Sequence, residues 1–330
     1  MTEIKERNNT LDFLRGFAAI WIVLIHTCFH SGDAYVPTLV KQLVLIIDVP
    51  LFMFLSGYTL HYSEGFEKNT KRLVKMYLYY LVFLLIFFVI AVIRNSQVVN
   101  LPNIIKAMFF QIPTGTTVKS FEYSIWFIPM YFVVTLIGSS FLKNDNLKII
   151  HLITIFVIYG LSLYYFKVPT LPMIFMYLFI YCLGYYSYYH KLSIKKFIIF
   201  IIAIIGLNIL LKYFGEYGFR KLQDAKFDYD ITYLIYSMIS IIISWFIITR
   251  IKTRSKGISL IGKNAILLYF SQCFSSSILF FIEPMIKISW PQKILVMFLI
   301  NITYCLIIFA VFYWLFKLIN PLINKIINQE

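Results

Sequence analysis

Charged residues are scarce in this chain of 330 residues, at 14% of the sequence, and acidic residues are half as frequent as basic ones. A soluble domain is about a quarter charged, so this shortage excludes an ordinary soluble fold. Cysteine is also rare: the four cysteines lie inside apolar segments without metal-ligand spacing, which indicates neither a disulfide framework nor a metal site. The first apolar run lacks a small-residue cleavage site, so we expect it to be a retained helix.

Apolar and aromatic residues fill the chain instead, with 60% hydrophobic residues, 19% Phe, Trp or Tyr, and a mean hydropathy of +0.80. Runs long enough to cross a hydrocarbon layer of ~30 Å recur along its length. They predict an all-α polytopic membrane protein with about ten transmembrane helices. We expect one domain over residues 1–330, without a separate soluble domain. The predicted spans are 11–30, 41–61, 73–93, 123–142, 149–166, 171–190, 197–213, 231–250, 262–282 and 293–316.

The net charge of +15 comes from short clusters of Lys and Arg between apolar runs. This pattern is typical of topology signals and lipid-facing loops, and it argues against nucleic acid as a partner. If the N-terminus lies in the cytoplasm, most basic residues fall in cytoplasmic loops. Cytoplasmic loops of membrane proteins carry an excess of Lys and Arg, so both termini are predicted to be cytoplasmic. Two outer loops, 94–122 and 214–230, are long and polar. The first contains Pro102 and Pro113, and we expect it to be irregular.

Arg15 and His26 lie about three helical turns apart on the first predicted helix, roughly 16 Å of rise, and so share one face. The same stripe carries Asp12 and His30. Ionisable residues inside a membrane helix are costly, which points to a functional role. Each also has a structural interpretation: Arg15 as a cation that reaches the inner surface, and His26 as a hydrogen-bonded core histidine.

The second predicted helix runs back and places Asp48 at a depth similar to His26, and Ser56 at a depth similar to Arg15. Antiparallel neighbours would then form an outer Asp–His layer and an inner Arg–Ser layer. A carboxylate beside an imidazole fixes its tautomer and raises its basicity, as a general base requires. The alternatives are a solvated Asp48 at a helix end and a helix-packing notch at Ser56.

Three basic residues, Lys71, Arg72 and Lys75, cluster at the inner start of the third span. Clustered cations suit phosphates, either of lipid headgroups or of a nucleotide-like cofactor. At the start of the fourth span, Trp126 fits an interfacial aromatic belt. Glu122 is a candidate for a polar outer cavity.

These residues occur in an order that resembles the membrane acyltransferase-3 family, from about residue 9 to residue 272. The matching segments are Arg15-Gly16 with His26, Asp48 to Phe52, Ser56-Gly57-Tyr58, Lys71 to Tyr77, Trp126-Phe127-Ile128 and Gly262 to Tyr269. The late motif of that family often ends in histidine, and here the position is Gln272. A serine common within the motif is Ala265. The departure leaves His26 as the only candidate base of the motif set.

The resemblance implies transfer of an acyl group, commonly acetyl, from cytoplasmic acyl-CoA to a hydroxyl of a surface glycan or its lipid-linked precursor. Capsular or exopolysaccharide is the favoured acceptor class, and the bacterial cytoplasmic membrane is the expected location. Expected partners are membrane lipid, the glycan acceptor, and either a second copy or glycan-synthesis machinery; no metal is expected. The expected residues are His26 and Asp48 for catalysis, Arg15, Lys71, Arg72 and Lys75 for acyl-CoA (acetyl-CoA), and Ser56, Trp126 and Glu122 for substrate or oxyanion contacts.

A transporter or flippase is the main alternative, since it too is a helix bundle with intramembrane charges. The lack of an internal repeat and of paired broken helices counts against it. A membrane sensor or scaffold is a third class, and it would not need His26. Direct transfer and an acyl-enzyme intermediate both stay open.

Overall fold

A computed structural model of the chain describes residues 8–31, 35–62, 65–93, 101–109, 120, 124–142, 149–165, 170–214, 222–253 and 255–328. These residues form helices and contain no strand, which confirms the all-α prediction. The chain divides into two compact units. Unit 1 is Met1–Trp21, Thr38–Phe66 and Val133–Lys263, and unit 2 is Ile22–Pro37, Glu67–Phe132 and Asn264–Glu330. The expected single domain over 1–330 stays a prediction.

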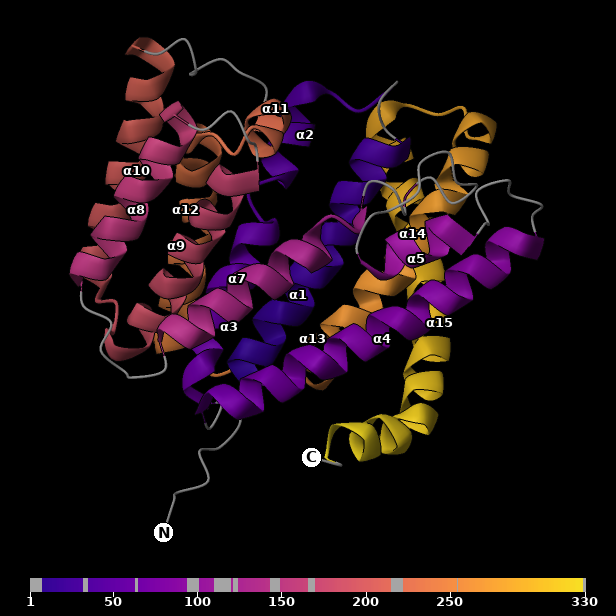
Figure 1. Cartoon of the computed structure of the whole chain (residues 1–330). Helices are drawn as coiled ribbons and strands as arrows, with labels where there is room; N and C mark the ends of the chain where they lie inside the picture. Colours follow the sequence, from indigo (N-terminus) through magenta and orange to yellow (C-terminus); the bar gives the residue numbers. More distant parts are fainter. Residues whose placement is uncertain are drawn as a thin grey trace. The chain divides into compact units, whose positions relative to one another are not determined.

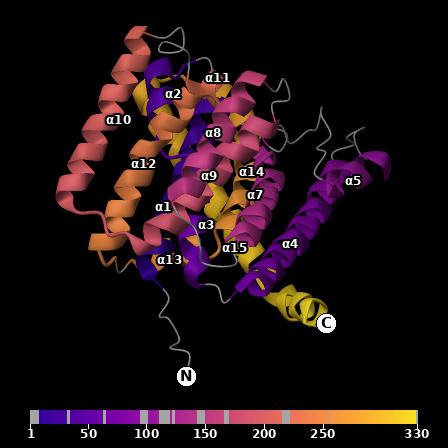
Figure 2. The same ribbon diagram turned by 60° about the vertical axis from the view of Figure 1, so that its left-hand side comes forward.

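Unit 1 is built around α3, which packs along α9, while α9 also packs along α8 and α10 along α12 (Figures 1 and 2). Its helices also include the first part of α1 and most of α7. The bounds are α1 Asn9–His26, α2 Thr38–Val44, α3 Val49–Thr59, η2 Leu60–Tyr62, α7 Phe127–Phe141, α8 Ile149–Tyr165, α9 Thr170–Tyr189, α10 Ile194–Phe214, α11 Leu222–Phe227, α12 Ile231–Arg250 and α13 Lys256–Lys263.

The predicted span 41–61 consists of two helices, because the chain turns between α2 and α3. Pro50 stands at the second position of α3, where its missing N–H leaves no hydrogen bond unmade. Asp48 precedes the helix in an extended conformation. The turn therefore presents Asp48 at the N-terminus of α3.

Unit 2 is built on the packing of α14 against α15, with both also contacting η1 (Figure 1). Its elements are η1 Thr27–Ser31, α4 Gly65–Ile93, α5 Leu101–Met108, α14 Ala265–Ile282, η3 Glu283–Met285 and α15 Trp290–Ile327. One prediction needs correction, because the loop 94–122, expected to be irregular, contains the helix α5, whose second residue is Pro102. The helix α15 contains the predicted span 293–316 and extends beyond it, with Pro321 inside the helix.

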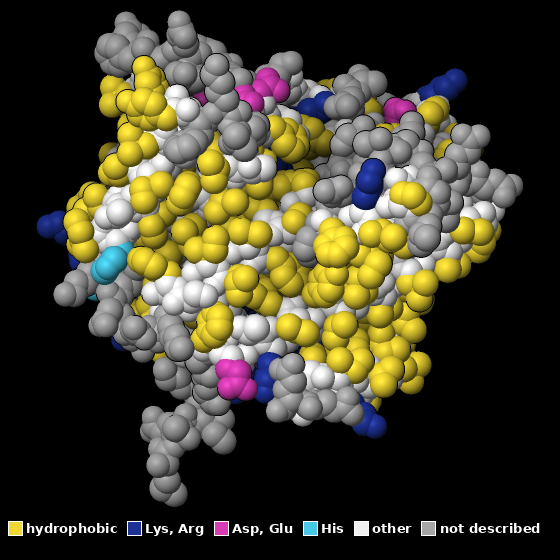
Figure 3. Space-filling view, viewed as in Figure 1, with side chains coloured by type: hydrophobic (Ala, Val, Ile, Leu, Met, Phe, Trp, Pro, Cys, Tyr) yellow, Lys and Arg dark blue, Asp and Glu magenta, His cyan; other side chains and the backbone are white. Residues whose placement is uncertain are grey.

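All ten predicted spans fall on helices, and seven helical segments of the described residues have the length and hydropathy to cross a membrane. Two further apolar helices, Phe127–Phe141 and Ile149–Tyr165, are shorter. Hydrophobic side chains cover most of the described surface in Figure 3, and many large ones are exposed on α8, α10 and α15. These features establish a polytopic membrane protein, while the number of ten spans and the cytoplasmic termini stay predictions.

Candidate active site

Helix α1 is continuous from Asn9 to His26 and ends in the single π-helical turn η1. Arg15 and His26 therefore lie on one helix, as the sequence predicts. Arg15 belongs to the part of the helix in unit 1, and His26 to unit 2. Both side chains are half-buried. Single π turns are frequent at functional sites, and this one begins directly after His26.

Arg15 is held against α3 by a hydrogen bond. Its Nη2 donates to Thr59 Oγ1 at 2.5 Å, and the Thr59 hydroxyl donates to the Ser56 carbonyl at 3.0 Å. Arg15 thus contacts α3 at Thr59, whose hydroxyl links it to the Ser56 carbonyl. The predicted inner layer of Arg15 with Ser56 stays a prediction. Sequence reasoning missed Thr59, although it lies three residues after Ser56 on the same helix face.

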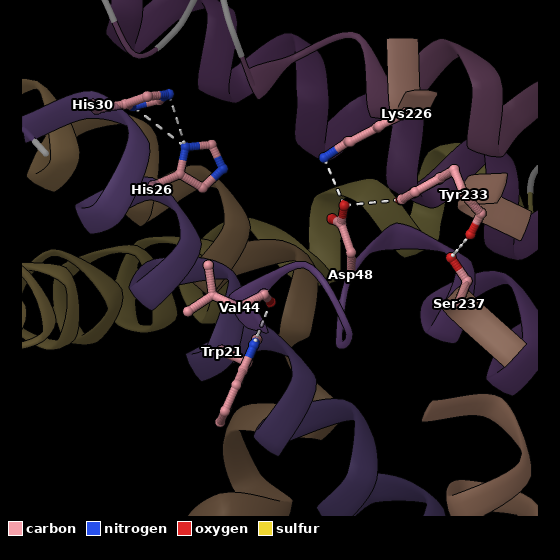
Figure 4. Close-up of polar contacts among 8 residues, drawn as sticks. All are labelled: Trp21, His26, His30, Val44, Asp48, Lys226, Tyr233 and Ser237. Atoms are coloured by element: carbon pink, nitrogen blue, oxygen red, sulfur yellow. Dashed lines mark hydrogen bonds and ion pairs between the residues drawn. The ribbon is translucent and has the colours of Figure 1, made fainter. Parts of the chain in front are cut away.

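Asp48 lies in a buried ion pair within unit 1. Its Oδ2 accepts from Lys226 Nζ at 2.7 Å and from the Tyr233 hydroxyl at 2.8 Å (Figure 4). The Asp48 side chain is 2% exposed and that of Lys226 is 9% exposed. The predicted pairing of Asp48 with His26 joins residues of different units, and it stays a prediction.

Lys226 comes from α11, the short helix between α10 and α12. The turn after it is fixed at two points. Asp230 accepts from the backbone N–H of Thr232 at 2.7 Å and caps α12, and the Tyr159 hydroxyl donates to the Tyr229 carbonyl at 2.6 Å. Tyr229 has a left-handed backbone with φ of 55°, and burial raises the pKa of its hydroxyl, with Asp228 adding to the effect. The loop predicted at 214–230 is thus ordered around Asp48 where the structure describes it.

His26 contacts a second histidine in unit 2. Its Nδ1 lies 3.2 Å from His30 Nε2 and 3.3 Å from His30 Nδ1, and the two rings meet edge to face (Figure 4). His30 Nδ1 in turn lies 2.7 Å from Ser120 Oγ. The second ring nitrogen of His26 lies on the side of the ring away from His30 (Figure 4).

A buried asparagine holds the helix turn that ends at His26. Asn301 of α15 donates from Nδ2 to the Val23 carbonyl at 3.3 Å and to Thr27 Oγ1 at 3.0 Å, and it accepts from Ser275 at 2.7 Å. Thr27 itself donates to Val23 O at 2.8 Å. In a π turn a backbone N–H bonds to the carbonyl five residues earlier and not to the one four residues earlier. The Asn301 and Thr27 side chains supply hydrogen bonds to the Val23 carbonyl at this change of pattern.

The basic cluster lies on α4. Lys71 pairs with Glu67 at 2.9 Å, Lys75 Nζ donates to Asn324 Oδ1 of α15 at 3.1 Å, and Arg72 is exposed. Lys75 also lies 5.8 Å from the centre of the Tyr79 ring. This arrangement suits a phosphate at a membrane surface, whether of a lipid or of a cofactor.

Tyr35, Lys293 and Glu283 form a polar cluster in unit 2. Lys293 Nζ pairs with Glu283 at 2.6 Å and lies 4.7 Å from the centre of the Tyr35 ring. Burial raises the pKa of the Tyr35 hydroxyl above its ordinary value. Among the described residues, no group of three or more His, Cys, Asp or Glu has the geometry to hold a metal ion.

Comparison with known proteins identifies the chain. The acyltransferase domain family matches residues 8–321, nearly its full length. The chain belongs to the acyltransferase-3 family of membrane proteins. An amino-acid racemase from Enterococcus faecalis is 29% identical over 156 residues, which cover 44% of this chain and 21% of the racemase. The match thus spans about a fifth of the racemase, and no solved structure matches the chain.

Two of the acyltransferase-3 motifs meet at a glycine contact in unit 1. A Cβ on Gly16 would lie closer than 3.0 Å to the Ile258 carbonyl of α13, and a Cβ on Gly262 equally close to the Asp12 carbonyl of α1. Only glycine allows the two backbones to approach this far. The first and late motifs are therefore joined by backbone packing beside Arg15.

The late motif also contacts the motif Trp126-Phe127-Ile128, within unit 2. Phe127 contacts Tyr269 with ring centres 5.6 Å apart, and the Tyr269 hydroxyl donates to the Ser124 carbonyl. Trp126 lies beside Phe127 and is half-buried. Gln272 is buried on α14. Glu122 lies outside the described residues. Its expected role stays a prediction, as does that of Trp126.

Proposed function

We propose that this acyltransferase-3 protein transfers an acetyl group from acetyl-CoA to a hydroxyl of a surface glycan or its lipid-linked precursor, with capsular or exopolysaccharide as the favoured acceptor. The bacterial cytoplasmic membrane is the proposed location, with the donor on the cytoplasmic side. Family membership over residues 8–321 supports acyl transfer. The placement of a cation and an imidazole on one membrane helix carries the assignment of roles.

In the proposed reaction, His26 removes the proton from the acceptor hydroxyl. The hydroxyl oxygen forms a bond to the thioester carbonyl carbon, the carbon–sulfur bond breaks, and CoA leaves as the thiol after protonation. Either the acceptor attacks directly, or an acyl-enzyme forms first. Ser56, Trp126 and Glu122 are the proposed contacts to substrate or to the oxyanion.

The donor carries its negative charge on phosphates, away from the thioester. Lys71, Arg72 and Lys75 are proposed to bind those phosphates, and Arg15 the arm between phosphate and thioester. The exposed Arg72 guanidinium has the planar fork that suits phosphate oxygens. The Thr59 hydrogen bond holds Arg15 in a defined orientation, which supports a binding role over a side chain that reaches freely into the headgroups.

A transfer assay tests the proposal. Purified protein in lipid nanodiscs is given acetyl-CoA labelled in the acetyl group, together with de-O-acetylated capsular polysaccharide, and the free CoA thiol and labelled polymer are measured. His26→Ala is expected to lower the rate by about 10²–10⁴-fold, the usual contribution of a general base. His190→Ala is the matched control, because His190 is exposed at the end of α9.

The results separate the alternatives. Release of CoA thiol by the wild type and its loss in His26→Ala support the enzyme. Transfer at the wild-type rate by folded His26→Ala contradicts the base assignment. A wild type that neither transfers nor hydrolyses the label, but moves the polysaccharide or its precursor across the bilayer, would favour the transporter.

A further inference from the structure

A chain of three polar side chains begins at His26 and leads into the interior of unit 2. His26 Nδ1 faces His30 Nε2 at 3.2 Å and His30 Nδ1 at 3.3 Å, while His30 Nδ1 lies at 2.7 Å from Ser120 Oγ. The two nitrogens of His30 lie at nearly the same distance from His26 Nδ1, but Nδ1 makes the much shorter contact with Ser120. We therefore assign Nδ1 of His30 to Ser120 and Nε2 to His26. His30 thus lies between the proposed base and a buried hydroxyl.

Several contacts fix the far end of this chain. Ser120 is fully buried, and its backbone N–H donates to Ser277 Oγ of α14 at 3.2 Å. Ser277 Oγ donates to the Cys273 carbonyl at 2.8 Å. The His30 ring stacks on Phe280, with ring centres 6.0 Å apart. His30 is therefore held by α14 and by Ser120, and it is not a mobile side chain at a helix end.

The hydrogen-bond roles follow from what a general base needs. His26 must keep Nε2 unprotonated to accept a proton, so its own hydrogen stands on Nδ1. This N–H donates to His30 Nε2, which must then be the acceptor nitrogen of His30. The hydrogen of His30 therefore stands on Nδ1 and donates to Ser120 Oγ. All three groups have compatible roles in this single arrangement.

We propose that His30 is the positioning residue of His26, and that Ser120 fixes the tautomer of His30. The inference rests on the proposed function. It assigns to an imidazole the orienting role that the sequence gives to Asp48, whose Oδ2 binds Lys226 and Tyr233. When His26 accepts the substrate proton, its new positive charge is stabilised by the hydrogen bond to neutral His30.

Kinetics of His30 and Ser120 variants in the transfer assay test the inference. His30→Ala is expected to lower kcat by at least ~10-fold with little change in KM for acetyl-CoA, because His26 loses the partner that orients it and not its substrate. His30→Gln is expected to recover much of that loss, because its side-chain oxygen can accept from His26 Nδ1. Ser120→Ala is expected to lower kcat by less than His30→Ala.

Matched controls are His190→Ala and Ser140→Ala; Ser140 is exposed and donates only to the carbonyl four residues before it. Thermal unfolding in detergent shows whether each variant folds. If His30→Ala does not fold, the kcat values of His30→Gln and Ser120→Ala are compared with that of Asp48→Asn instead. A wild-type kcat in folded His30→Ala, or a loss confined to KM, overturns the inference while leaving the His26→Ala result intact. An inactive wild type overturns the proposed function instead.

Discussion

The carboxylate of Asp48 is removed from solvent, and its charge is balanced by the Lys226 ammonium, with a hydrogen bond from Tyr233. Removing one partner of a buried ion pair costs about 3–5 kcal/mol, because the remaining charge is left unpaired. We therefore expect Lys226→Met to lower the free energy of unfolding by about this amount. Thermal or denaturant unfolding of the purified protein in detergent measures it.

The double variant Asp48→Asn with Lys226→Met tests whether the loss of stability in Lys226→Met comes from the unpaired charge of Asp48. Replacing both partners removes the unpaired charge, so most of the lost stability is expected to return. If Lys226→Met alone unfolds like the wild type, the ion pair does not stabilise unit 1. The activity of the folded double variant then shows whether Asp48 is needed to orient His26.

For single side chains, the sequence predicts the helix that carries a residue better than it predicts the residue's partners. The positions of Arg15 and His26 on one helix follow from periodicity, and the structure confirms that helix. The partner of Arg15, Thr59, and the partner of His30, Ser120, do not follow from periodicity, because each is brought close by a contact between distant segments. Lys226 is a stronger example. It lies in the predicted polar loop 214–230, where a lysine is expected to be exposed, yet it is buried against Asp48.

The packing of α1 on α13 depends on two glycines, Gly16 and Gly262. A Cβ at Gly262 would overlap the Asp12 carbonyl, and the helices would have to separate to relieve the overlap. Overpacking of this kind costs about 1–3 kcal/mol or more, so Gly262→Ala is expected to lower the unfolding temperature. Because α13 packs beside Arg15, acetyl-CoA affinity is expected to fall as well.

Gly257 of the same helix provides the matched control, since a Cβ there meets no atom within 4 Å. Gly257→Ala is expected to leave stability unchanged or raise it by up to about 1 kcal/mol, because alanine loses less backbone entropy on folding. Equal unfolding temperatures for the two alanine variants would contradict the close contact. Unfolding by temperature in one detergent compares them directly.

Helices were more predictable than their ends and breaks. Long apolar runs give the ten predicted spans, and all of them fall on helical segments, although 41–61 and 262–282 each cover parts of two α-helices. Pro50 marks the interruption between α2 and α3, but the turn itself depends on how the chain packs in unit 1. The helix α15 extends past the predicted span 293–316, and it accommodates Pro321 although a proline usually stops a helix. The π turn after His26 has no signal in the sequence, since it depends on Asn301 from another helix.

Over the whole chain, the exposed hydrophobic side chains agree with a lipid environment, and the basic residues supply the orientation. α15 has 38 residues, and at 1.5 Å per residue its length of ~57 Å exceeds a ~30 Å hydrocarbon core. Lys287 precedes this helix and Lys325 lies in its last turn, and both side chains are exposed. The two lysines therefore lie on opposite sides if α15 spans the membrane.

The excess of basic residues on the N-terminal side predicts that Lys325 is cytoplasmic and Lys287 external. Lys287→Cys is therefore expected to react with a membrane-impermeant maleimide on intact cells, whereas Lys325→Cys should react only after the membrane is permeabilised. The four native cysteines are free and buried, so their background labelling is expected to be low. Labelling of Lys325→Cys on intact cells, with Lys287→Cys protected, would reverse the orientation and place the basic cluster of Lys71, Arg72 and Lys75 on the side without acetyl-CoA. Because the proposed donor is cytoplasmic, that single result would also remove the phosphate-binding role of the cluster, even if acyl transfer itself were observed.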